Sequence, residues 1–200
     1  MVDIKLNFIN NSDDHNSLGI VIFQKNLAGG YGEIAVAWKV IENCRHGWSH
    51  PFIYPMAMYV SASDSWGNFS PLLSASNGQL FKVVESASGD ILQYSGQTAG
   101  SQNEVDVLNA LQIGAVDANI YRDGRLLAAK TGIAPGQKAV FSFKPAIWIG
   151  VVSQVREGDV MNSAVLSQIN TEISLLGIKR ADIMAVPGVI RHLLCSLCKM

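Results

Sequence analysis

The chain has 200 residues, of which 48% are apolar and only 16% are charged. This low charged fraction and a mean hydropathy of +0.21 exclude an intrinsically disordered chain. Fifteen Lys and Arg residues against sixteen Asp and Glu leave no positive excess to neutralise phosphates, which disfavours general nucleic-acid binding.

Short apolar runs between turn dipeptides predict an all-β fold. The dipeptides are Asn77-Gly78, Gly89-Asp90, Asp123-Gly124 and Pro135-Gly136. In chain order, the expected strands are 4–9, 19–25, 33–41, 55–62, 79–84, 91–94, 105–111, 116–122, 126–131, 138–143 and 148–155. The polar, Gly-rich segment 95–104 is expected to be a surface loop.

Two of these features are especially regular. The alternation of the first run places Ile4, Leu6 and Phe8 on one face of a strand. Asp123-Gly124 predicts a type I′ hairpin, because both residues tolerate a positive φ.

Segment 164–176 has two interpretations. Apolar residues from Val165 to Ile169 follow a helical period, whereas Ile169 and Ile173 also fit one face of a strand. We favour a strand, because β-branched residues and Gly177 close the segment.

The tail beyond residue 188 differs in composition from the rest of the chain. Val189, Leu193 and Leu197 lie on one apolar helical stripe, which predicts a short helix packed on its own domain. One alternative is that the stripe packs on a second subunit and forms a homo-oligomer. Another is that a two-base shift of the reading frame has replaced a closing strand over 191–200.

The pattern as a whole predicts one antiparallel, jelly-roll-like β-sandwich of about ten strands. This single domain is expected to span 1–188, followed by the tail 189–200, since no linker or low-complexity tract divides the chain.

The segment 44–69 is unusually aromatic. Trp and Tyr rings stack on the apolar faces of sugars while Asp and Asn bind hydroxyl groups, and the same rings also suit a bilayer interface. The segment therefore predicts a glycan site or a peripheral membrane contact. The candidate ligand-binding residues are Trp48, His50, Tyr59, Asp64, Trp66 and Asn68.

Asp64-Ser65-Trp66-Gly67-Asn68 is the most specific part of this segment. Gly67 permits a close backbone approach, and Asp64 and Asn68 flank the indole of Trp66 with acceptor and donor groups. The alternative is a turn in which Asp64 and Asn68 bond their own backbone while Trp66 packs inward.

Cys44, His46 and His50 form a candidate metal set, because thiolate and imidazole suit zinc. Their spacing matches no known signature, and Gly47 and Pro51 predict a loop. The alternative is a buried thiol beside solvated histidines, and no cofactor is predicted.

The remaining cysteines, Cys195 and Cys198, have CxxC spacing but lack a second ligand pair. Three cysteines do not suggest a disulfide framework, and residues 1–7 lack the features of a signal peptide. No apolar run is long enough for a transmembrane helix. The sequence thus predicts a soluble, cytoplasmic protein.

No catalytic residue is singled out, since the signatures of esterases, P-loop proteins, dinucleotide-binding folds and zinc proteases are absent. The leading hypothesis is a non-enzymatic, lectin-like protein that binds a glycan through 44–69. The alternatives are a membrane-active, toxin-like β protein, a metal-dependent enzyme at Cys44, His46 and His50, and a self-assembling structural protein.

Overall fold

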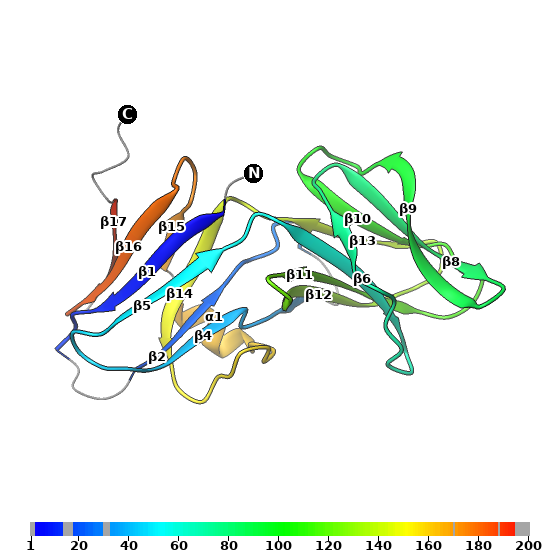
Figure 1. Ribbon diagram of the computed structural model, residues 1–200. Helices are drawn as coiled ribbons and strands as arrows, with labels where there is room; N and C mark the ends of the chain where they lie inside the picture. The colour runs from blue at the N-terminus through cyan, green and yellow to red at the C-terminus, as the bar shows by residue number, and fades with distance from the viewer. Residues whose placement is uncertain (1–2, 14–17, 30–32, 170, 188, 195–200) are drawn as a thin grey trace. The chain divides into compact units, whose positions relative to one another are not determined.

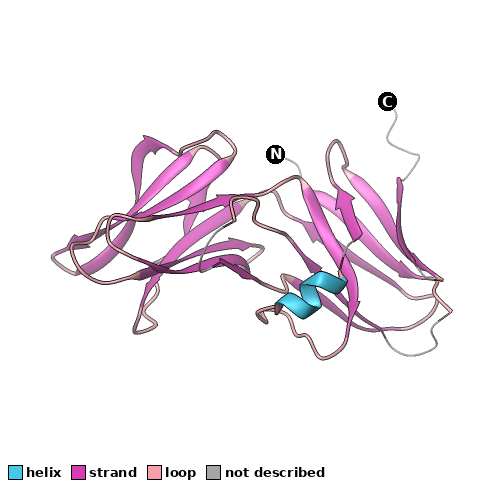
Figure 2. Ribbon diagram, turned by 180° about the vertical axis from the view of Figure 1, so that it is seen from behind, coloured by secondary structure: helices cyan, strands magenta, loops and turns pink. Residues whose placement is uncertain are grey.

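The computed structural model describes residues 3–13, 18–29, 33–169, 171–187 and 189–194 (Figure 1). Strands dominate these residues, and the helix α1 (Ser163–Gln168) is short (Figure 2). No helix in the described part of the chain is long and apolar enough to cross a bilayer. The all-β prediction is therefore confirmed.

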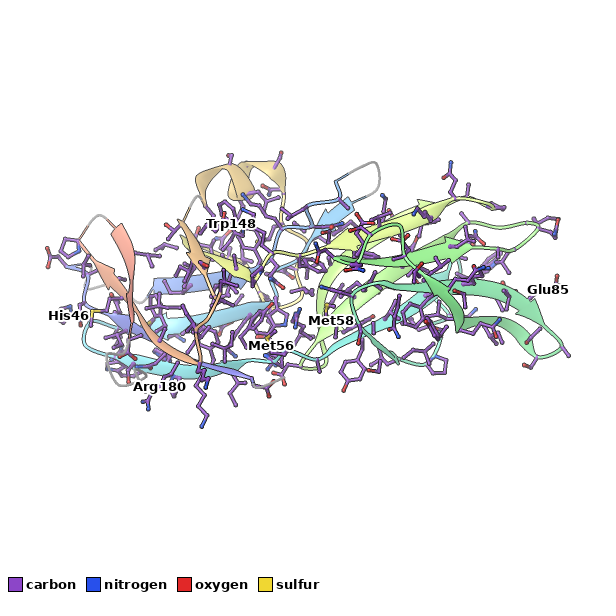
Figure 3. All side chains as sticks on the ribbon, turned by 90° about the horizontal axis from the view of Figure 1, so that it is seen from above. His46, Met56, Met58, Glu85, Trp148 and Arg180 are labelled. Atoms are coloured by element: carbon purple, nitrogen blue, oxygen red, sulfur yellow. The ribbon has the colours of Figure 1, made fainter. Side chains whose placement is uncertain are left out.

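The strands of the described residues form four sheets, so the prediction of a single sandwich of about ten strands is wrong. The chain divides into two compact units. Unit 1 consists of Met1–Gln24, Val36–Met56 and Pro145–Met200, and unit 2 consists of Lys25–Ala35 and Ala57–Lys144. Side chains fill the interior of each unit (Figure 3).

Unit 1 contains two four-stranded sheets. The first has the order β17 (Val189–Leu194), β16 (Arg180–Val186), β1 (Ile4–Asn10) and β5 (Ser49–Tyr54). The second has the order β15 (Thr171–Ser174), β14 (Ala146–Val152), β2 (Leu18–Phe23) and β4 (Lys39–Cys44). Trp38 packs edge-on against Tyr54, with ring centroids 5.7 Å apart, and joins the strands of both sheets in one core.

Unit 2 contains a four-stranded and a five-stranded sheet. The first has the order β13 (Lys138–Ser142), β10 (Glu104–Asn109), β8 (Gln79–Ser86) and β9 (Gly89–Thr98). The second has the order β3 (Glu33–Ala35), β12 (Arg125–Ile133), β11 (Val116–Arg122), β6 (Met58–Asp64) and β7 (Leu73–Ala75). Phe81 and Phe141 of the first sheet and Ile120 and Leu127 of the second are fully buried.

The sheets are not purely antiparallel. β1 pairs with β16 in parallel, and β8 pairs with β10 in parallel, whereas the other strand pairs are antiparallel. Since parallel neighbours require a crossover between them, both units contain connections that a simple up-and-down meander lacks.

The predicted helix over the tail is also wrong, because Val189–Leu194 forms β17 and pairs antiparallel with β16. The physical reason is that β16 offers an open edge to the chain that follows it directly. Residues 195–200, with Cys195 and Cys198, lie outside the described residues.

The segment 164–176 contains both of the alternatives considered for it. Asn162 caps α1 by accepting a hydrogen bond from the backbone N–H of Val165, and the chain then enters β15. The strand that we favoured is therefore limited to Thr171–Ser174.

The loop predicted after Cys44 is shorter than expected, because β5 begins at Ser49. Pro51, whose residue type favours a loop, lies within β5, opposite Asn7 of β1. β5 is an edge strand of its sheet, and an edge tolerates proline because one side of the strand has no ladder partner to receive an N–H.

Candidate functional site

The structure divides the aromatic segment 44–69 between the two units. Trp48 and His50 belong to unit 1, whereas Tyr59, Asp64 and Asn68 belong to unit 2. The site is therefore described unit by unit.

In unit 1, Trp48 is the last residue of the connection between β4 and β5. Its side chain is 51% exposed, the guanidinium of Arg45 lies 5.7 Å from its ring centre, and the His50 ring lies 6.2 Å away. The Nε2 atom of His50 is buried and has no hydrogen-bond partner among the described residues. Trp48 and His50 thus form a small aromatic surface on unit 1.

The predicted metal ligands are not brought together. The Cys44 side chain is buried, and burial raises the pKa of its thiol, whereas His46 is exposed and its Nδ1 lies 2.7 Å from the Ser12 carbonyl oxygen. Within the described ranges, no three or more His, Cys, Asp or Glu side chains are placed to hold a metal ion. The metal-dependent enzyme therefore gains no support.

In unit 2, the residues after β6 form a tight turn held by Asp64. Its carboxylate accepts hydrogen bonds from the backbone N–H groups of Trp66 and Asn68, both at 2.9 Å, and from the Asn68 side-chain amide at 2.8 Å. Gly67, with a φ of 84°, donates its N–H to the Asp64 carbonyl. A side chain at position 67 would be strained at this φ, so the glycine is required by the turn.

The hydrogen bonds confirm the turn, but Trp66 does not pack inward. The turn positions its indole in solvent, with 89% of the residue exposed, and Phe69 is 64% exposed. Tyr59 belongs to β6, the strand that ends at Asp64, but lies five residues before Asp64, about 16 Å away along the strand at the usual rise per residue.

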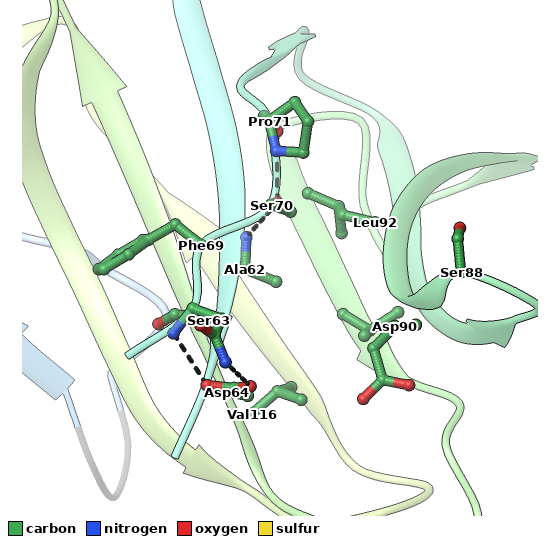
Figure 4. A pocket seen from close by; sticks show the side chains of 13 residues that line it. Ala62, Ser63, Asp64, Phe69, Ser70, Pro71, Ser88, Asp90, Leu92 and Val116 are labelled. Carbon is green, nitrogen blue, oxygen red and sulfur yellow. Dashed lines mark hydrogen bonds between the residues drawn. The ribbon is translucent and has the colours of Figure 1, made fainter. Parts of the chain in front are cut away.

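A groove with a volume of about 340 Å³ opens beside the turn (Figure 4). Ser63 and Asp64 come from β6 on one side, and Ser88 and Asp90 come from the β8–β9 hairpin on the other. The full set of lining residues is Ala62, Ser63, Asp64, Asn68, Phe69, Ser70, Pro71, Val83, Ser88, Gly89, Asp90, Leu92 and Val116.

The groove combines an apolar floor with a polar rim. Val83, Leu92 and Val116 are buried, whereas Asp90 is exposed, and its carboxylate makes no hydrogen bond within the part of the chain that the structure describes. Such a lining suits a ligand that has both apolar faces and hydroxyl groups. Of the predicted ligand-binding residues, only Asp64 and Asn68 line the groove.

Sequence reasoning missed Ser88 and Asp90. The Gly89-Asp90 dipeptide correctly indicated a turn, but the sequence does not reveal that this hairpin lies next to the Asp64 turn. That proximity depends on how the two sheets of unit 2 pack.

We expect the Asp64 turn to lose its order only in acid. The pKa of Asp64 is lowered by the hydrogen bond from the Asn68 side chain and then by that from the Asn68 backbone, with smaller contributions from Trp66 and Gly67. Because the pKa of Asp64 is lower in the folded chain than in the unfolded chain, the ionised carboxylate stabilises the turn at pH values above the unfolded pKa. This stabilisation is lost as the pH falls through the folded pKa.

The Asn68 amide signals in NMR should therefore stay constant from pH 7 to about pH 4 and change below it. Asp64→Asn should abolish this titration. A midpoint at or above the ordinary Asp value would show that these hydrogen bonds do not form in solution.

No protein-family model matches this chain, and neither the curated proteins nor the solved structures contain a significant match.

Proposed function

We propose that unit 2 is a recognition module that binds a neutral saccharide in the groove between the Asp64 turn and the β8–β9 hairpin. The observation that supports this most is the combination of carboxylate, amide and hydroxyl groups with an exposed aromatic ring around an apolar floor. Sugars need both kinds of contact, because their ring faces are apolar and their edges carry hydroxyl groups.

The Asp64 turn supplies a rigid acceptor for such a ligand. Its carboxylate already accepts three hydrogen bonds, and a carboxylate has about four acceptor positions, so one remains for a ligand hydroxyl. The bonds within the turn hold this acceptor in place before binding, which lowers the entropy lost on association.

Asp90 supplies a second acceptor from the opposite side of the groove. Because both charged groups of the rim are carboxylates, a phosphorylated or sulfated ligand would be repelled, whereas a neutral saccharide would not. The groove volume lies at the lower end of the usual range for ligand pockets, about 300–1,000 Å³, which suits one or two sugar rings.

The proposal is tested by screening the protein on a glycan array and measuring the affinity of each hit by calorimetry. We expect Asp90→Ala and Phe69→Ala to weaken saccharide binding by about 10- to 100-fold, the value of one charged hydrogen bond or one stacked ring. Both residues are exposed, so neither substitution should unfold the protein.

Trp48→Ala is the matched control, because Trp48 is a half-exposed aromatic residue of unit 1 and does not line the groove. It should bind the saccharide as wild type does. Undiminished affinity in Asp90→Ala, or an equal loss in Trp48→Ala, would place the site elsewhere, and the absence of any glycan hit would reject the function.

A further inference from the structure

Three loops meet at one end of unit 2. β11 runs antiparallel to β6 with Val116 opposite Asp64, so the loop before β11 and the loop after β6 leave the sheet at the same end. The side-chain amide of Asn109 donates to the Gly114 carbonyl at 2.9 Å and to the Ile133 carbonyl at 2.8 Å, which ties in the β12–β13 connection. We refer to residues 65–72, 110–115 and 134–137 as the loop end.

The loop end exposes large apolar side chains at its tips. Trp66 is 89% exposed, Ile113 is 87% exposed, and Phe69 and Leu72 are at least half exposed. Single exposed apolar residues are common, but several on adjoining loops of one end mark an interaction surface.

The loop end also carries no formal charge, because none of its residues is Asp, Glu, Lys or Arg. The carboxylates of Asp64, Asp90 and Asp117 lie next to the loop end. Lys138, which directly follows residue 137, is a neighbouring cation, and its ammonium lies 2.6 Å from the Asp106 carboxylate. This distribution does not favour an anionic lipid or a nucleic acid as the partner.

Three backbone N–H groups at the Trp66 tip are satisfied within the turn. The N–H groups of Trp66, Gly67 and Asn68 all donate to Asp64, so burying this tip leaves none of these three donors without an acceptor. Unsatisfied backbone groups oppose placing a loop against hydrocarbon, and here the turn lowers that cost for its three N–H donors.

From these observations we propose that the loop end docks on the interface of an uncharged, zwitterionic lipid bilayer, with Trp66 and Ile113 as its anchors. Trp suits this position because its ring is apolar and its N–H remains in the hydrated headgroup layer. Neither anchor lines the saccharide groove, so this proposal does not depend on the proposed function.

Vesicle flotation tests the proposal with phosphatidylcholine vesicles and with vesicles that also contain phosphatidylserine. We expect wild-type protein to float with phosphatidylcholine alone, with no gain from phosphatidylserine. Trp66→Ser and Ile113→Ser should each lower the partition coefficient about tenfold, the value of burying one large apolar side chain. Brominated lipid should quench the fluorescence of wild-type protein more than that of Trp66→Phe.

The matched control is Ile53→Ser, which removes an exposed isoleucine from β5 of unit 1. This variant should bind vesicles as wild type does, and thermal melts should show that all three Ser variants remain folded. Absence of binding to phosphatidylcholine, a requirement for phosphatidylserine, or an equal loss in Ile53→Ser would overturn the proposal. Self-association that Ile113→Ser abolishes, without vesicle binding, would assign the loop end to a second copy of the chain instead.

Discussion

Asn109→Ala is expected to lower the free energy of unfolding by about 3 kcal/mol, because it removes three hydrogen bonds of a fully buried side chain. The amide donates to the carbonyls of Gly114 and Ile133, and its oxygen accepts from the backbone N–H of Leu111 at 3.1 Å. Alanine would leave these backbone groups without their present partner. Urea unfolding followed by circular dichroism measures the loss.

Asn103→Ala is the control for this prediction, since Asn103 is an exposed asparagine of the same unit. It should change the free energy of unfolding by less than about 0.5 kcal/mol. Amide hydrogen exchange in Asn109→Ala should also speed up in residues 110–115. If Asn109→Ala and Asn103→Ala are equally stable, the side chain of Asn109 does not hold the loops as described.

A second large effect is expected in unit 1, where Trp38→Ala should lower the free energy of unfolding by about 4 kcal/mol. Trp38 is only 1% exposed and contacts the ring of Tyr54. The Tyr54 hydroxyl donates to the Gln24 side-chain oxygen at 2.8 Å, and the Gln24 amide donates to the Ala146 carbonyl at 2.7 Å. Removing the indole leaves a cavity beside this buried chain of hydrogen bonds.

Trp48→Ala provides the comparison, because the same side chain is removed from a half-exposed position of the same unit. We expect it to lower the free energy of unfolding by less than about 1 kcal/mol. Trp38→Phe should fall between the two alanine variants, since a smaller ring fills part of the cavity. Equal stability of Trp38→Ala and Trp48→Ala in urea unfolding would contradict the core position of Trp38.

Local periodicity predicted most strands because it reports which face of a strand is buried. Ile4, Leu6 and Phe8 are buried on one face of β1, as their alternation indicated. Asp123 and Gly124 both have a positive φ, 53° and 69°, in the turn between β11 and β12, as predicted from their identities alone. In both cases the information is local, since it depends on residues only a few positions apart.

No local feature of the sequence indicates the division into two units. Each unit is assembled from separate segments, and the boundary between Ala35 and Val36 falls inside the expected strand 33–41. In the structure this run separates into β3 of unit 2 and β4 of unit 1. Linker composition marks a boundary only where one domain is complete before the next begins. Here the chain leaves each unit before that unit is complete and returns to it later.

The candidate site shows the same limit. The sequence by itself indicated the Asp64 turn as one of two interpretations, because Asp, Gly and Asn at those positions have conformational preferences of their own. Only the tertiary structure decided that Trp66 is exposed and that Asp90 faces the turn across a groove.

The composition of the chain, low in charge and rich in apolar residues, shows where this limit lies. The sequence determined that such a chain forms buried strands, because burial follows from residue type and period. Strand order and register then decided which uncharged loops lie together at the end of unit 2. They pair residues as distant in the sequence as Asp64 and Val116. Pairing at such separations depends on the packing of the whole unit, and no local pattern encodes it.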